Sequence, residues 1–167
     1  KTAALLKQTA FSTLSTLDPI RDGFRAAIAR TVDTFGATSP NPSVGCALLD
    51  SEGRILTVGV HPKAGQPHAE AMALAQARDA GVLDQARTAI VTLEPCNHTG
   101  RTPPCSEALR NSPVEHVWIG VADPTPQAAG GAARLQEMPG GRDVTFLKDV
   151  PELADLYRDC RALLAPF

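Results

Sequence analysis

Four side chains in the middle of the chain combine the residue types of a metal site with a proton carrier. His68 and Glu70 lie at the start of an expected helix. Cys96 and Cys105 bound the loop that follows an expected strand. Histidine nitrogen and cysteine sulfur bind zinc, and a glutamate can accept and return protons. Because positions two residues apart on a continuous helix differ by about 200° in direction, His68 and Glu70 cannot be adjacent ligands. At a helix start, however, the histidine can turn toward a metal while the glutamate approaches from another side.

This combination resembles the signature of the zinc deaminases. In that class a histidine and two cysteines hold the ion, and a glutamate two residues after the histidine moves protons without binding the metal. Three protein ligands leave a fourth position for water, as in catalytic rather than structural zinc sites. The resemblance implies that His68, Cys96 and Cys105 bind Zn²⁺. It also implies that Glu70 takes a proton from water and passes it to the departing amino group.

Three stretches carry a narrower resemblance: residues 38–45, residues 61–70 and residues 91–105. In the last of them, eight residues separate the two cysteines, where the common deaminase pattern has two. With this spacing the chain is similar to the deaminase domain of the bifunctional riboflavin biosynthesis proteins, diaminohydroxyphosphoribosylaminopyrimidine deaminase, in the cytidine deaminase-like superfamily. The similarity runs from about Ile20 to Val121. It implies hydrolytic deamination of a phosphoribosylated diaminopyrimidinone with release of ammonia.

The same resemblance implies a set of substrate-binding residues. An asparagine amide both donates and accepts hydrogen bonds, as the edge of a pyrimidine ring requires. Cationic and hydroxyl side chains in a proline-stiffened loop suit a single phosphate group. The expected residues are one for the base, four around the ribose and phosphate, and one in a further matching dipeptide: Asn41, His61, His98, Arg101, Thr102 and Asp123.

Some segments depart from the family pattern. The family usually has Asp-Pro-Asn-Pro where this chain has Asp-Pro-Thr-Pro at residues 123–126, which predicts an altered substrate contact at Thr125. The glycine-containing segments 130–132 and 138–141 also differ.

Two other functions stay open: a deaminase of another pyrimidine or purine nucleotide in a specialised pathway, or a non-catalytic zinc-bound module used for assembly. The presence of Glu70 argues against the module, and Arg101 favours a phosphorylated small molecule.

Composition narrows the classes of partner. The chain has 167 residues and a net charge of −2, without the basic excess of a general nucleic-acid or anionic-membrane binder. Its apolar runs are far shorter than the roughly 20 residues that a membrane span needs. A chain of this length can bury a core without disulfides, so the four cysteines are expected as thiols in a cytoplasmic protein. The expected partners are a phosphorylated aminopyrimidine, further copies of this chain, and a separate or excised reductase domain.

Hydrophobic periodicity, turn residues and caps predict one α/β domain. Residues 1–17 are expected to be an extension or short helix, and residues 18–167 the zinc-dependent deaminase domain, with no reductase domain in this chain. Asp18-Pro19 is expected to begin a helix that packs along one apolar face, and this face includes Phe35.

Cys46 and Cys160 are interpreted as buried apolar residues, and His116 has no assigned role. The expected fold is a three-layer α/β/α sandwich with a mixed central sheet, cytidine deaminase-like. The expected elements are strands at 44–49, 54–60, 89–93, 114–121 and 144–147 and helices at 19–35, 68–80, 104–110, 128–138 and 151–164.

Overall fold

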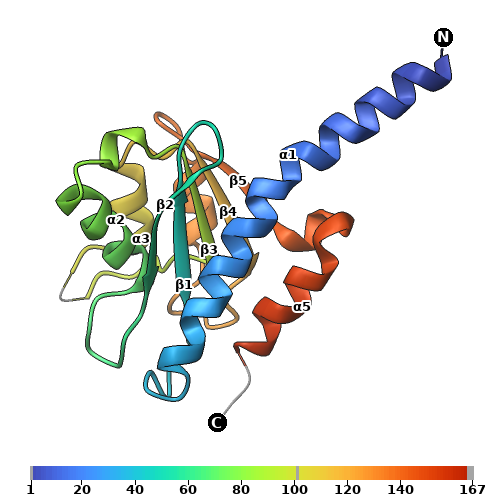
Figure 1. The fold of residues 1–167 in the computed structure, drawn as a ribbon. Helices are drawn as coiled ribbons and strands as arrows, with labels where there is room; N and C mark the ends of the chain where they lie inside the picture. Colours follow the sequence, from blue (N-terminus) through green and yellow to red (C-terminus); the bar gives the residue numbers. More distant parts are fainter. Residues whose placement is uncertain (1, 101, 165–167) are drawn as a thin grey trace.

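A mixed five-stranded sheet forms the centre of the molecule (Figure 1). The computed structural model describes residues 2–100 and 102–164, with side chains from residue 17 on. The strand order is β2-β1-β3-β4-β5. β1 is antiparallel to both of its neighbours, whereas β3, β4 and β5 are parallel. The strands are β1 Gly45–Leu49, β2 Ile55–Val60, β3 Thr88–Leu93, β4 His116–Val121 and β5 Asp143–Phe146.

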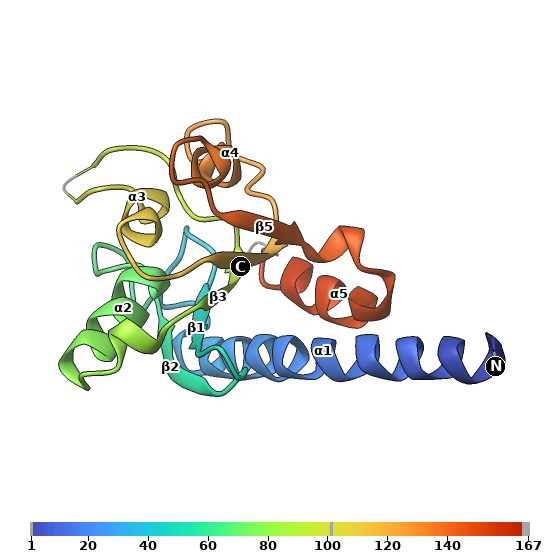
Figure 2. The same cartoon turned by 90° about the horizontal axis from the view of Figure 1, so that it is seen from above.

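Helices cover both faces of this sheet. α1 and α5 pack on one face, and α2, α3 and α4 pack on the other, as the view from above shows (Figure 2). The predicted three-layer α/β/α arrangement is therefore confirmed. The helices are α1 Thr2–Thr31, α2 Ala69–Asp79, α3 Cys105–Arg110, α4 Gly131–Gln136 and α5 Ala154–Ala162, with short 3-10 turns at Val32–Thr34, Leu83–Gln85, Leu147–Asp149 and Pro151–Leu153. None of the helices among the described residues is long and apolar enough to span a membrane.

The first helix differs from the prediction at both of its ends. It begins at Thr2 and runs through Pro19, and its first turns extend beyond the sheet (Figures 1 and 2). Proline has a helical φ angle, so the chain continues through it with the loss of one backbone donor. The helix ends at Thr31 and tightens into a 3-10 turn, which takes Phe35 off the packed face and leaves it 55% exposed. The predicted helix start at Asp18-Pro19 and the predicted burial of Phe35 were wrong.

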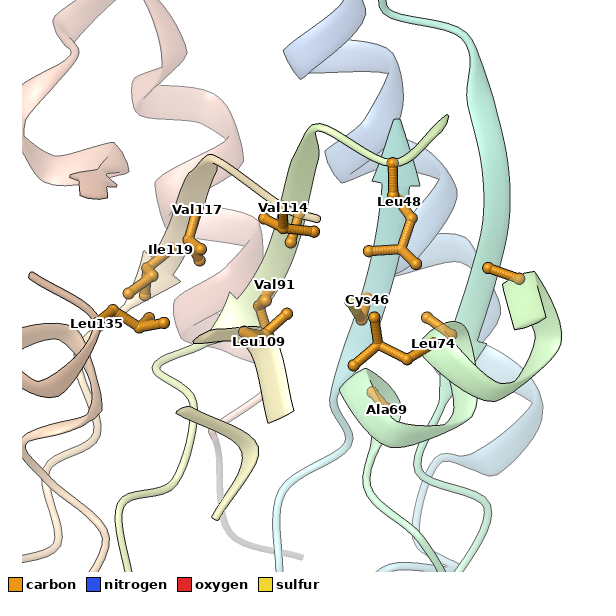
Figure 3. Packing of buried hydrophobic residues seen from close by; sticks show 14 of the residues in the cluster. Cys46, Leu48, Ala69, Leu74, Val91, Leu109, Val114, Val117, Ile119 and Leu135 are labelled. Atoms are coloured by element: carbon orange, nitrogen blue, oxygen red, sulfur yellow. The ribbon is translucent and has the colours of Figure 1, made fainter. Parts of the chain in front are cut away.

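Two aliphatic cores hold the layers together. One lies between the sheet and α1 with α5, and it contains the buried Phe24 and Cys160. The other lies under α2, α3 and α4 and contains the buried Cys46. Figure 3 shows strand residues such as Leu48, Val91 and Ile119 facing helix residues such as Leu74 and Leu109. Cys46 and Cys160 are thus buried free thiols, as predicted.

Strand directions bring four loops to one edge of the sheet. Gly45, which begins β1, pairs with Val60, which ends β2. Because β1 is antiparallel to β3, the start of β1 also lies beside the end of β3. β4 is parallel to β3 and ends at the same edge, where Leu93 pairs with Val121. The segments before β1, after β2, after β3 and after β4 therefore meet, and they carry the residues that the sequence singled out.

A glycine brings the start of α2 close to this edge. A Cβ atom on Gly59 would lie 2.4 Å from the carbonyl oxygen of Ala69 and 2.5 Å from the amide nitrogen of Ala73. Only glycine therefore permits this approach of α2 to β2. Ala69 lies between His68 and Glu70, so the close packing fixes both neighbours relative to the sheet.

Candidate functional site

Three candidate metal ligands meet where α2, α3 and the end of β3 converge. His68 is the residue before α2, Cys96 lies in the loop after β3, and Cys105 is the first residue of α3. Their ligand atoms all lie within 4.8 Å of one another. The Nδ1 atom of His68 is 3.7 Å from Cys96 Sγ and 3.5 Å from Cys105 Sγ. Residues distant in sequence thus form one compact cluster of nitrogen and sulfur atoms.

These separations fit one tetrahedral zinc ion. With Zn–N bonds of about 2.0–2.1 Å and Zn–S bonds of about 2.3 Å, tetrahedral angles place nitrogen and sulfur about 3.6 Å apart. The two observed distances, 3.5 Å and 3.7 Å, bracket this value. Thiolate and imidazole ligands also favour zinc over magnesium or calcium, which bind oxygen. The geometry and the donor types therefore both suit zinc.

Hydrogen bonds within the cluster prepare one sulfur to carry negative charge. A hydrogen bond from Cys105, with a smaller one from His68, lowers the pKa of Cys96 to about 4 against the effect of burial. The pKa of Cys105 is raised because its thiol donates to Cys96 and is buried. The hydrogen bond to Cys96 also raises the pKa of His68. Since metal ligands must be deprotonated, zinc binding would release these protons.

The loop between the cysteines is closed by hydrogen bonds at its two ends. The amide of Cys105 donates to Cys96 Sγ at 3.3 Å, and the amide of Ser106 donates to the Cys96 carbonyl oxygen at 3.2 Å. The Ser106 hydroxyl donates to Asn97 Oδ1 at 3.0 Å. These contacts hold the two sulfur atoms together across the long loop.

Glu70 lies beside this cluster in the first turn of α2. Its side chain lines the same pocket as His68 and Cys96 and is 3% exposed. Burial raises the pKa of Glu70 to about 7. A carboxyl group whose pKa lies near neutrality can both accept and donate a proton, as general acid and base catalysis requires.

A pocket of about 400 Å³ joins these residues to most of the expected substrate-binding residues. Its polar lining includes Asn41, His61, His68, Glu70, Glu94, Cys96, His98, Asp123 and Thr125. Val44, Leu93, Ala128 and Leu164 are among its apolar walls. Thr102 is exposed and does not line the pocket, and Arg101 lies outside the described residues, so both assignments stay predictions.

Two of the expected substrate-binding residues are held by main-chain contacts. The amide of Asn41 donates to the Thr38 carbonyl oxygen at 2.8 Å, and the buried Thr38 hydroxyl donates to the Asn41 carbonyl oxygen at 2.9 Å. His61 Nδ1 lies 3.0 Å from the Pro67 carbonyl oxygen. Because a carbonyl oxygen only accepts, Nδ1 is the donor in this contact, and in a neutral imidazole Nε2 is then an acceptor. His61 therefore offers an acceptor from an almost fully buried ring.

Glu94 lines the pocket but had no assigned role in the sequence. Its Oε1 atom accepts from the Asp123 amide, and its Oε2 atom accepts from the Ala132 amide, each at 3.0 Å. The sequence feature that could have identified Glu94 is a charged residue directly after an apolar strand. Thr125 also lines the pocket, and its amide and hydroxyl both donate to Asp123 Oδ1, at 2.8 Å and 2.7 Å.

Residues 22–121, which hold every candidate ligand and Glu70, match the family model of the cytidine and deoxycytidylate deaminase zinc-binding region. The chain belongs to this family. Zinc is the metal of the family, and among the described residues His68, Cys96 and Cys105 form a cluster that could hold it.

Curated relatives confirm the resemblance to the riboflavin biosynthesis deaminases. The chain is 57% identical over 102 residues to the chloroplastic riboflavin biosynthesis protein PYRD of Zea mays, covering 60% of this chain and 25% of that protein. It is 50% identical over 109 residues to riboflavin biosynthesis protein RibD of Escherichia coli K12, covering 65% of this chain and 28% of that protein. The chain thus spans about a quarter of the length of these relatives.

Solved structures agree with this assignment. A diaminohydroxyphosphoribosylaminopyrimidine deaminase/5-amino-6-(5-phosphoribosylamino)uracil reductase from Thermotoga maritima superposes with a TM-score of 0.73 at 35% identity, covering 86% of this chain and 39% of that one. RibD of Acinetobacter baumannii superposes with a TM-score of 0.69 at 38% identity, covering 89% of this chain and 41% of that one. The predicted cytidine deaminase-like fold is therefore confirmed.

Proposed function

We propose that this chain catalyses the zinc-dependent hydrolytic deamination of a phosphoribosylated diaminopyrimidinone in riboflavin biosynthesis. The observation that carries this proposal is that Glu70, Asn41 and the cluster of candidate zinc ligands lie around one pocket of about 400 Å³. The curated relatives that this chain matches are named as riboflavin biosynthesis proteins. In the reaction, a C–O bond forms and a C–N bond breaks at the same ring carbon, and the amino group leaves as ammonia.

His68, Cys96 and Cys105 would hold the ion, and Glu70 would move the protons. When bound, zinc acidifies water and so supplies a nucleophile at neutral pH. Glu70 is buried beside the cluster, and its pKa of about 7 suits it to take a proton in the first half of the reaction. It would then return that proton to the departing amino group. One carboxyl group would thus act first as base and then as acid.

The substrate would extend from the base pocket toward the loop between the cysteines. Asn41 would bind the edge of the ring, and the free Nε2 of His61 would accept a hydrogen bond from a substrate hydroxyl or amine. His98 lines the outer part of the pocket, while Arg101 and Thr102 are assigned to the phosphate by the resemblance alone. Asp123 lines the same pocket and would form part of its wall.

The proposal also covers the partners of this chain and its location in the cell. The name of the Thermotoga relative includes a reductase, so we propose that a reductase domain consumes the product, as a separate or fused unit. A cytoplasmic location and a homo-oligomer remain proposals, and the maize relative is named as chloroplastic. The pocket position of Thr125 supports one alternative, a related pyrimidine or purine nucleotide as substrate.

Ammonia release from a panel of compounds tests the proposal. The panel contains the diaminopyrimidinone with and without its ribosyl phosphate, together with cytidine. Charge-assisted hydrogen bonds to a phosphate contribute about 1.5–3 kcal/mol each. Removing the phosphate should therefore lower kcat/KM by at least about tenfold, and Arg101→Ala should lose activity mainly on the phosphorylated compound. Equal losses on both forms, or comparable efficiency on cytidine, would contradict this substrate assignment.

A further inference from the structure

Glu94 connects three segments that surround the pocket. It directly follows β3 and lies two residues before the candidate ligand Cys96. Its own amide donates to the Val121 carbonyl oxygen at 2.8 Å. Its two carboxylate oxygens bind the amides of Asp123, in the segment after β4, and Ala132, in the first turn of α4. A single residue thus links the turn that carries Cys96 to two other parts of the chain.

The carboxylate is almost fully removed from solvent, and each of its oxygens has a main-chain donor. Glu94 is 8% exposed. A buried charged group is costly unless it is hydrogen-bonded, so this pair of bonds is what makes the position acceptable for a carboxylate. A glutamine at the same position has one acceptor oxygen, and its amide group would face a second N–H donor. The contact therefore requires a carboxylate in particular.

Contacts of Gly131 and Thr125 add to the links that Glu94 makes between these segments. A Cβ atom on Gly131 would lie 1.8 Å from the carbonyl oxygen of Pro95, so the start of α4 packs directly on the residue before Cys96. On the other side, Thr125 donates twice to Asp123 Oδ1. The pocket wall at residues 123–125 is thus tied through Glu94 to the turn that carries the metal ligand.

We propose that Glu94 is a positioning residue that holds this wall in its substrate-binding position. It acts through the Asp123 amide and does not contact the reacting atoms. The inference rests on the proposed function, because the wall is taken to contact the substrate. Loss of the contact should weaken substrate binding more than turnover, because Glu70, His68 and Cys105 lie on other elements, and Cys96 is also held by the amide of Cys105.

The test compares Glu94→Gln with Asp50→Asn. Asp50 is a matched control because it is also 8% exposed, and its Oδ1 atom accepts the amides of Glu52 and Arg54, both at 2.9 Å. It lies in the turn between β1 and β2 and does not line the pocket. For both variants we would measure zinc content, Tm, kcat, KM and hydrogen exchange at the amides of residues 123 and 132.

Glu94→Gln should raise KM by about tenfold, which corresponds to 1.36 kcal/mol, with a smaller change in kcat and full zinc content. Exchange at the amides of residues 123 and 132 should accelerate. Asp50→Asn should lower Tm with KM and both exchange rates unchanged. Glu94→Asp keeps the charge but is shorter by one methylene, so it should raise KM by less.

Unchanged KM in a folded Glu94→Gln variant would overturn the inference and leave a structural role only. If that variant does not fold, unchanged KM and unchanged exchange in Glu94→Asp would overturn it instead. A wild-type chain that is inactive on every aminopyrimidine would refute the proposed function. The exchange rates at residues 123 and 132 are measured without substrate, so they would still decide whether Glu94 holds the wall.

Discussion

Replacing Gly59 by alanine tests whether the contact between β2 and α2 positions the candidate catalytic residues. The new Cβ would lie 2.4 Å from the Ala69 carbonyl oxygen and 2.5 Å from the Ala73 amide nitrogen, whereas ordinary contact begins at 3.4 Å. Both obstructing atoms belong to the helix backbone, so no side-chain rotation relieves the overlap. α2 must therefore retreat by about 1 Å, the difference between these distances.

This retreat would move His68 and Glu70, which flank Ala69. A displacement of about 1 Å in a positioned catalytic group lowers catalytic efficiency by on the order of 10²-fold. Overpacking of this kind costs about 1–3 kcal/mol of folding free energy. For a chain of this size that corresponds to a decrease in Tm of roughly 2–12 °C. We therefore expect Gly59→Ala to fold, with lower zinc affinity and a large loss of kcat/KM.

The assay combines ammonia release, zinc titration and thermal unfolding, with Gly45→Ala as the control. A Cβ on Gly45 would lie 2.3 Å from the Ala27 carbonyl oxygen, an equally close contact with backbone. That contact is with α1, which carries none of the candidate site residues. Gly45→Ala should therefore lose stability but keep most of its activity. Equal kcat/KM in Gly59→Ala and Gly45→Ala would refute the role of this contact in positioning His68 and Glu70.

Three further predictions concern the metal, the proton carrier and acid stability. Wild-type protein should hold one zinc per chain by elemental analysis, and Cys96→Ala should lose it, because two protein ligands bind the ion much more weakly. Glu70→Gln should keep zinc and Tm but lose turnover by more than the 10²–10⁴-fold typical of general acid or base groups, because one residue serves both transfers. The side-chain hydrogen bond from Arg54 lowers the pKa of Asp50. Its stabilising effect should therefore be complete above the ordinary aspartate pKa and disappear as the pH falls through the lowered value. Unfolding free energies of wild type and Asp50→Asn should accordingly converge in acid.

Turn residues and residue types within short segments were sufficient to predict most of the fold and the metal cluster. The turn residues at 50–53 predicted the hairpin of β1 and β2, and it is present. His68, Cys96 and Cys105 could be predicted because histidine and cysteine are identifiable as ligands by residue type, and their atoms do meet within 4.8 Å. The course of α1 through Pro19 could not be predicted, because proline is compatible with both a helix start and a helix interior.

The groups that bind Glu94 are main-chain N–H groups, and this explains why the contact could not be recognised from the sequence. Glu94 binds amides that lie 29 and 38 positions further along the chain. Every residue except proline offers the same N–H group, so residue type does not mark such a partner. The contact depends instead on the parallel pairing of β3 with β4, in which Leu93 lies opposite Val121 and Asp123 therefore follows beside Glu94. Because this pairing joins distant segments, it is the register of the sheet that places Asp123 beside Glu94 at the pocket.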